Sequence, residues 1–422
     1  MTEFRINKLS LEGFRSFKNS ELIFPKSNVL LLIGNNGKGK SSILDAIALL
    51  LNDFVQQLHK PRVDLDLNIK KTDIKIGYND LTIRGDFKTE KGDFTTTLST
   101  SDEVMKGRSS ELALLNVILT QSNTRLPILM YYKSNRLFNL AEEFVNNDKN
   151  FDNFSYYSRT FSQQSLDFTE FQTWFRLEED IENDQIRRLK DFKLTNPKLD
   201  VIRACIKSFF NNLEGSEILF SDLRVERIGT KSQLVIKKDI TEFSFEQLSD
   251  GEKMLLLLVC DIAYRLSEIS PSTPTASILS GSGIVLIDEI DIHLHPKWQR
   301  NVLPALTKTF PNIQFIATTH SAQVISRVQR ESVRVLDDGK ILMVSSNPIG
   351  RDANAILEEI QQVSKRPKEI EMLIEAYFER INNNDFEDAD VFKRQLLDYL
   401  DSEDPIFARA NAMIERKKML TP

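Results

Sequence analysis

A glycine-rich loop of eight residues constrains this chain more than any other feature of its sequence. The run Gly34-Asn35-Asn36-Gly37-Lys38-Gly39-Lys40-Ser41 fits the pattern G-x-x-x-x-G-K-[ST]. A continuous apolar run, 29–33, precedes the loop, and apolar residues recur at helical spacing from Ser42 to Leu58. The loop therefore stands at a strand-to-helix junction of an α/β domain, the context in which this pattern binds phosphate.

The residue types of this loop suit the binding of ATP. Glycines let backbone N–H groups turn toward phosphate oxygens, the lysine supplies a cation toward the β- and γ-phosphates, and the final hydroxyl can ligate Mg²⁺. A chance glycine-rich turn is the alternative, but it leaves the flanking strand and helix unexplained. We therefore expect ATP and Mg²⁺ as cofactors, with Ser41 as a metal ligand and the nucleotide held by Asn35, Asn36, Gly37, Lys38, Gly39, Lys40, Ser41 and Ser42.

A second apolar run, 284–287, ends in the two carboxylates Asp288 and Glu289. Such a strand can deliver one carboxylate to the metal and place the other to orient or deprotonate the attacking water. Taken alone, the pair suits a capping or salt-bridge role equally well. Together with the phosphate loop, it predicts that Asp288 ligates Mg²⁺ and that Glu289 is catalytic.

Two further segments carry candidate residues. Leu248-Ser249-Asp250-Gly251-Glu252-Lys253 opens an apolar helix, 254–266, and a capping box with Glu252 explains this pattern without any ligand. His320 follows the apolar strand 314–317, where a histidine can hydrogen-bond the γ-phosphate and the attacking water. A lone histidine is usually structural, but its place after the Asp-Glu strand favours a catalytic role. His293 and His295 lack the i, i+4 spacing of a helical zinc site, so zinc is not expected.

These four elements, in this order, resemble the SMC/RecF-type branch of ABC ATPases over residues 4–60 and 243–345, and the opening segment 11–17 strengthens the resemblance. The resemblance implies that Arg15 reaches the nucleotide. It also implies that Ser249, Gly251 and Glu252 form a signature motif that meets the γ-phosphate of ATP bound by the other subunit. Asp250 departs from the usual glycine of that signature, and no convincing Q-loop glutamine is found.

Within this branch, the segments 126–136 and 288–299 and the short insertion resemble the single-chain ATPases of bacterial defence, which include the PtuA type of the Septu antiphage systems. That resemblance implies a homodimer across ATP, a higher homo-oligomer, and an HNH nuclease of the PtuB type as partner. The chain itself shows no HNH cluster, so any DNA contact is expected through the complex. The alternatives are a RecF-like repair ATPase that binds DNA directly, and a nucleotide-gated scaffold with negligible turnover.

Composition narrows the choice between these alternatives. A formal net charge of -6 and a pI near 5.6 argue against a protein that coats nucleic acid through its overall field. The two cysteines, Cys205 and Cys260, stand in apolar surroundings and suit buried free thiols in a reducing compartment. No run approaches the ~18 apolar residues of a membrane span, so we expect a cytoplasmic protein.

The pattern along the chain predicts an α/β ATPase domain in two parts, 1–138 and 221–365, around a helical insertion, 139–220. Residues 63–100 alternate like antiparallel strands that include Ile74, Ile76, Leu81 and Ile83, 127–133 resembles another buried strand, and 270–282 is expected to be a loop. From Arg366 onward, 13 acidic and 9 basic residues accompany three amphipathic helical patterns, which predict a C-terminal helical module, 366–422.

Overall fold

The computed structural model describes residues 3–58, 68–90, 92–101, 126–134, 157, 161, 168–213, 220–228, 231–269, 278–352, 355–356 and 366–420. The chain forms two compact units, Met1–Ala353 and Asn354–Pro422. Much of the predicted insertion, including 139–156, and most of the predicted loop 270–282 lie outside the described residues. Within the described part of the chain, no helix combines the length and the apolar character needed to cross a membrane.

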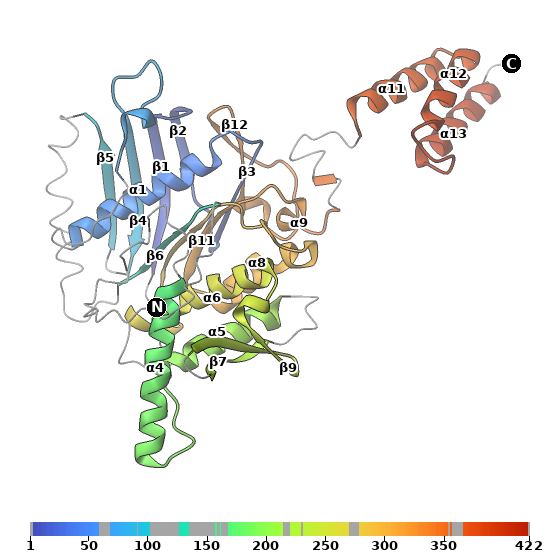
Figure 1. Ribbon diagram of the computed structural model, residues 1–422. Helices are drawn as coiled ribbons and strands as arrows, with labels where there is room; N and C mark the ends of the chain where they lie inside the picture. The colour runs from blue at the N-terminus through green and yellow to red at the C-terminus, as the bar shows by residue number, and fades with distance from the viewer. Residues whose placement is uncertain are drawn as a thin grey trace. The chain divides into compact units, whose positions relative to one another are not determined.

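The described residues of the larger unit form three sheets and the helices that cover them (Figure 1). The strands are β1 Phe4–Phe14, β2 Phe17–Ile23, β3 Val29–Ile33, β4 Thr82–Thr89, β5 Gly92–Ser99, β6 Ile128–Tyr132, β7 Phe220–Ile228, β8 Lys231–Lys238, β9 Thr241–Ser244, β10 Gly283–Ile287, β11 Ile313–Thr318, β12 Val333–Asp337 and β13 Lys340–Met343. The helices are α1 Lys40–Leu58, α4 Phe168–Leu189, α5 Pro197–Asn212, α6 Asp250–Ile269, α8 Pro296–Thr309 and α9 Ala322–Ile325, with 3₁₀ turns η1 Lys71–Asp73, η3 Phe245–Gln247 and η4 Arg330–Ser332.

A six-stranded sheet in the order β13-β12-β3-β11-β10-β6 organises the unit. All its pairs are parallel except β12 with β13. Strands β6, β10 and β11 are buried along their whole length, which explains why they are apolar rather than alternating. Because the parallel strands point the same way, the residues that follow β3, β10 and β11 meet at one edge of the sheet.

Helix α1 lies between this sheet and a second, antiparallel sheet in the order β2-β1-β4-β5 (Figure 1). One core cluster joins the helix to both sheets, with Ile43, Ile47 and Leu50 of α1 all fully buried. The buried side chain of Gln314 in β11 also links the sheets, since its amide accepts from Ile6 N–H at 2.9 Å and donates to Ile6 O at 3.0 Å. This packing fixes the helix that begins at the phosphate loop.

The described part of the insertion, α4 and α5, packs on α6. The ring of Trp174 in α4 packs at a tilt of 58° against Tyr264 of α6, with centroids 4.7 Å apart, and its indole N–H donates to Glu268 at 3.0 Å. Both cysteines are buried and free, as predicted. Burial raises the pKa of the Cys205 thiol well above its ordinary value, so the group stays protonated and unreactive.

Two stretches differ from the sequence-based expectation. Strand structure begins only at Thr82, because Asp73 closes a 3₁₀ turn through a hydrogen bond from Lys70 N–H, Ile74 makes an isolated bridge to Phe14, and Ile76 is 99% exposed. The predicted antiparallel strands are confirmed over Thr82–Ser99, where β4 contains Ile83 and pairs with β5, but the prediction was wrong for Ile74 and Ile76. The three-stranded sheet β7-β8-β9 was not predicted at all, because its residues alternate with charges that pair across strands, as Arg224 does with Glu242.

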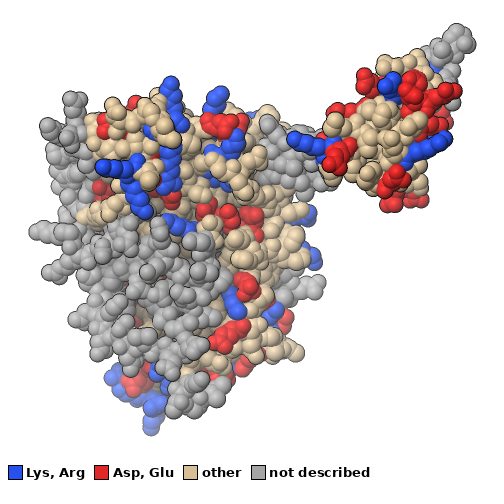
Figure 2. Space-filling model, turned by 45° about the horizontal axis from the view of Figure 1, so that its top comes forward, with Lys and Arg blue, Asp and Glu red and all other residues tan. Residues whose placement is uncertain are grey.

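The described part of the C-terminal unit contains the helices α11 Lys368–Asn382, α12 Phe386–Leu397 and α13 Pro405–Leu420. It has a small core of its own, formed by Tyr377, Ile381, Ala389, Leu396, Phe407 and Ala410. Arg366, just before α11, donates hydrogen bonds to both carboxylate oxygens of Asp404, just before α13, at 3.0 and 2.9 Å. The visible face of this unit carries many Asp and Glu side chains (Figure 2).

Candidate nucleotide-binding site

The phosphate-binding loop connects β3 to α1 through three glycines with positive φ, Gly34 at 144°, Gly37 at 77° and Gly39 at 97°. A Cβ at Gly37 would meet no heavy atom within 4 Å, so the loop leaves room on that side for phosphate oxygens. A Cβ at Gly39 would come within 2.8 Å of Phe17 Cζ and 2.9 Å of Ser16 Oγ, so a side chain there is excluded. The buried Ser16 hydroxyl has no hydrogen-bond partner among the described residues. The backbone is therefore shaped as a cradle that fits a phosphate group.

Lys40 is held inside this cradle. Its ammonium donates to Gly34 O at 2.7 Å and to Asn35 O at 3.1 Å, and only 7% of the residue is exposed. Burial lowers the pKa of Lys40, while the carboxylates of Asp288 and Glu289 act against that shift. A partly desolvated cation interacts strongly with an anion, which suits the predicted contact with the nucleotide phosphates.

The hydroxyl and the carboxylate predicted to ligate Mg²⁺ lie side by side. Ser41 Oγ donates to Asp288 Oδ2 at 2.9 Å, and Thr318 Oγ1 of β11 donates to Asp288 Oδ1 at 2.6 Å. A hydroxyl and a carboxylate, completed by phosphate oxygens, are the hard oxygen donors that Mg²⁺ prefers. Ser41 and Asp288 therefore fit the ion, which when bound would neutralise charge on the β- and γ-phosphates.

The two residues predicted to be catalytic follow neighbouring strands at the same edge. Glu289 adopts a left-handed φ of 51°, and its N–H donates to Thr318 Oγ1 at 2.7 Å. Such strain is found at functional sites, where it aims a side chain. His320 is exposed beyond β11, and partial burial together with Lys40 lowers its pKa against the pull of the nearby Asp291, Glu289 and Asp288. A neutral imidazole at this position can accept a hydrogen bond from water.

Arg15, at the turn after β1, adopts a φ of 48° and points toward α1. It donates to Asp45 Oδ2 at 2.6 Å, to Asp73 Oδ1 at 2.9 Å and to Ser42 Oγ at 3.4 Å. Desolvation lowers the pKa of Arg15, but the two carboxylates outweigh it and the pKa is raised. The structure thus brings Arg15 beside the loop residue Ser42, and its contact with the nucleotide stays a prediction.

The segment of the predicted signature begins α6 as a capping box. Ser249 N–H and Oγ both donate to Glu252 Oε2 at 2.8 Å, and Lys238 of β8 donates to Glu252 Oε1 at 2.6 Å. Burial raises the pKa of Glu252, but the bonds from Lys238 and Ser249 outweigh it and the pKa is lowered. A Cβ at Gly251 would lie 2.6 Å from His293 O, so glycine lets the helix contact the loop after β10. Among the described residues, the side-chain hydrogen bonds of Ser249 go to Glu252 and not to the phosphate loop.

A family model described as "AAA domain, putative AbiEii toxin, Type IV TA system" matches residues 29–326, which span the phosphate loop, Asp288, Glu289 and His320. The chain belongs to this family. The predicted fold class, an α/β P-loop ATPase domain of the ABC type with a helical insertion and a C-terminal helical appendage, is confirmed, and ATPase activity follows as the general property of the family.

The chain is also similar to proteins named from retron and Septu systems. The chain is 30% identical to the retron Ec83 probable ATPase of Escherichia coli over 87% of this chain and 78% of the relative. It is 29% identical to the Septu protein PtuA of Bacillus mycoides (strain KBAB4) over 81% of this chain and 40% of the relative. Among solved structures, an SMC head bound to the C-winged helix domain of ScpA aligns at a TM-score of 0.43 with 18% identity, over 81% of this chain and 97% of that chain. The predicted membership among ATPases of bacterial defence is confirmed by these named relatives.

Sequence reasoning missed several side chains that organise this AAA-family site. Asp45 and Asp73 hold Arg15, and Lys238 holds the signature glutamate. Asp45 could have been found, because it stands four residues after Ser41 and therefore on the same side of α1. Asp73 and Lys238 come from loops and strands with no sequence signal for these contacts.

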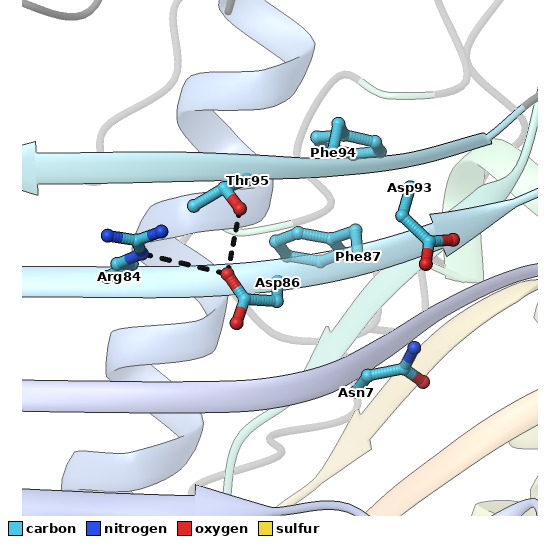
Figure 3. A pocket seen from close by; sticks show the side chains of 7 residues that line it. All are labelled: Asn7, Arg84, Asp86, Phe87, Asp93, Phe94 and Thr95. Carbon is cyan, nitrogen blue, oxygen red and sulfur yellow. Dashed lines mark hydrogen bonds and ion pairs between the residues drawn. The ribbon is translucent and has the colours of Figure 1, made fainter.

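A separate hollow of about 480 Å³ lies on the antiparallel sheet and contains none of the predicted site residues (Figure 3). It is lined by Asn7, Arg84, Asp86, Phe87, Asp93, Phe94 and Thr95. Thr95 donates to Asp86 Oδ1 at 2.8 Å, and Arg84 lies 3.7 Å from the same oxygen. Asp86 therefore pairs with both Thr95 and Arg84 along the wall of the hollow.

Proposed function

We propose that the chain is the ATP-binding and ATP-hydrolysing regulatory subunit of an antiphage defence complex. Two copies dimerise across ATP, form a higher homo-oligomer, and control a partner HNH nuclease of the PtuB type that carries the contact with DNA. The likeness to ATPases named from retron and Septu systems supports the defence setting.

One observation supports this function above the others, namely that Ser41, Asp288, Glu289 and His320 converge at one sheet edge beside the cradle. In the reaction, Lys40 and the loop N–H groups bind the phosphates, and Ser41 and Asp288 hold Mg²⁺. Glu289 orients the attacking water and takes its proton, while neutral His320 contacts the γ-phosphate side. The presence of Glu289 and His320 argues against a scaffold without turnover.

The dimer is supported by the position of the signature. The N–H and Oγ of Ser249 both donate to Glu252 at the start of α6, and the Glu252 N–H donates back to Ser249 Oγ at 3.4 Å. In the proposed dimer, the γ-phosphate held by the second copy replaces Glu252 as the partner of Ser249, and a helix N-terminus favours that anion.

Purification of the full chain together with its bound proteins tests this function. We expect an HNH nuclease to co-purify, ATP to be hydrolysed, and DNA cleavage by the complex to differ between the unaltered chain and Glu289→Gln. A recombination mediator in place of the nuclease would favour direct DNA repair. A complex whose cleavage ignores both ATP and Glu289→Gln would contradict the regulatory role.

A further inference from the structure

Two adjacent tyrosines end β6, the edge strand beside β10. In this parallel pair Tyr131 lies opposite Leu286 and Tyr132 opposite Ile287, and Tyr132 O accepts a 2.8 Å hydrogen bond from Asp288 N–H. The tyrosines therefore stand at the same sheet edge as the predicted metal ligand. Because successive residues of a strand point to opposite faces, their side chains reach different layers of the unit.

Tyr131 points toward α1 and belongs to the core cluster around that helix. Its hydroxyl donates to Asp45 Oδ1 at 2.9 Å, while the other oxygen of Asp45 accepts from Arg15 at 2.6 Å. Asp45 stands five residues after Lys40 on the same helix. The Tyr131 hydroxyl is thus bonded to the helix that begins at the phosphate loop.

Tyr132 points to the other face, toward α6. Its hydroxyl donates to Asp261 Oδ2 at 2.9 Å, while Asp261 Oδ1 accepts from Arg265 at 3.0 Å. Asp261 stands twelve residues after Ser249, on the helix that begins at the signature. Two neighbouring residues of one strand therefore bond the helix of the phosphate loop and the helix of the signature.

Packing alone does not require these hydroxyls. Tyr131 is 7% exposed and Tyr132 is 5% exposed, and a phenylalanine ring would fill the same space. A buried hydroxyl without a hydrogen bond destabilises the folded state. Each tyrosine therefore depends on the position of the carboxylate that accepts its hydrogen bond. Burial and the carboxylates of Asp45 and Asp288 raise the pKa of Tyr131 far above its ordinary value, which keeps the hydroxyl a donor.

We propose that Tyr131 and Tyr132 are positioning residues that couple the phosphate-binding helix α1 to the signature helix α6 through β6. ATP held at the start of α1 then sets the position of the signature that this chain offers to a second copy. The coupling is reciprocal, so docking of the second copy on the signature strengthens ATP binding at the chain's own loop. This inference rests on the proposed ATP-bridged dimer.

The test uses the full chain with Glu289→Gln, in which bound ATP is expected to persist. Tyr131→Phe and Tyr132→Phe each remove one hydroxyl and keep the ring. We expect ATP binding by the dilute monomer to stay within about twofold, whereas the ATP concentration that half-dimerises the chain rises about tenfold, a usual size for coupling between sites. The double variant should be no worse than either single one, because one missing bond already breaks the link. Light scattering during ATP titration measures the midpoint.

Tyr157→Phe is the matched control. Tyr157 is buried, and its hydroxyl donates to the backbone carbonyl oxygen of Pro127 at 2.6 Å, just before β6. We expect it to lower the melting temperature without moving the dimerisation midpoint. An equal rise of the midpoint in Tyr157→Phe would show a mere loss of stability and overturn the coupling, as would unchanged midpoints in both Tyr131→Phe and Tyr132→Phe.

Asp261 tests the same link from α6 if a tyrosine variant does not fold. Asp261→Asn keeps a carbonyl oxygen that can accept from Tyr132 and should retain the midpoint, whereas Asp261→Ala should raise it about tenfold. Equal midpoints in these two variants would overturn the role of this bond. If the chain with intact tyrosines forms no dimer with ATP, the proposed function fails and the coupling fails with it.

Discussion

At the residue scale, Lys40 is expected to act in ATP binding and Glu289 in ATP hydrolysis. Lys40→Ala removes the cation inside the loop, so we expect ATP affinity to fall by about 100-fold, as for a lost hydrogen bond between charged groups. Glu289→Gln keeps the shape but cannot take a proton, so binding should persist while turnover falls by about 100-fold or more. Labelled-ATP binding and phosphate release measure the two effects. Equal loss of binding in both variants would refute these roles.

His320 should set the acid limit of turnover. Its pKa is lowered, so the imidazole stays neutral below the ordinary value near ~6.5 and gains its proton only as the pH falls through the lower pKa. Protonation adds a cation beside Lys40 and removes an acceptor, so kcat should fall on that acid side. His320→Gln should lower kcat by about tenfold or more and remove the fall of kcat on the acid side of the pH profile. Measurement of kcat from about pH 5 to about pH 8 tests this prediction. An unaltered fall of kcat at acid pH in the variant would exclude His320 as its cause.

A site residue could be predicted from the sequence where its position is set by residues next to it in the chain. The loop residues Gly37 to Ser41 and the pair Asp288-Glu289 follow apolar strands, so their positions could be predicted. Asp73 lies 58 residues from Arg15, and the bond between them depends on how a turn folds back on β1. No local pattern carries that information.

At the scale of elements, the start of α6 in one copy is expected to contact the ATP bound by another copy. Ser249→Arg places a bulky cation at the helix N-terminus, so ATP binding by the monomer should survive while pairing and hydrolysis are lost. Mixing this variant with Lys40→Ala should restore at most one composite site, since the intact signature and the intact loop then come from different copies. Turnover of the mixture, compared with each variant alone, measures this. Normal hydrolysis by Ser249→Arg alone would refute the shared site.

The elements themselves were predictable where burial was uniform. Strands β3, β10 and β11 are buried on both faces and helix α1 has a buried stripe, so apolar runs and helical spacing identified each of them. Ile76 is the opposite case, since alternation suggested a strand and the residue is almost fully exposed in a turn. The sheet β7-β8-β9 escaped because cross-strand charge pairs such as Arg224–Glu242 replace the apolar pattern.

At the scale of the whole molecule, the C-terminal helices form a unit with a core of its own, so their role can be separated from that of the ATPase unit. Met372 is 69% exposed and Tyr399 is 66% exposed on this unit, which suits contact with another protein. We predict that ending the chain at Ala353 leaves ATP binding intact but removes higher assembly or recovery of the co-purifying nuclease.

Met372→Glu combined with Tyr399→Glu offers a gentler version of the same test, because both side chains lie outside the core of the unit. The pair should reproduce the loss of assembly or partner recovery while all three helices remain folded, as judged by circular dichroism. Light scattering and pull-down of the nuclease measure the two outcomes. If the folded truncation forms assemblies with the same number of copies as the full chain and still recovers the partner, the helices have no docking role. Docking must then be sought on the ATPase unit.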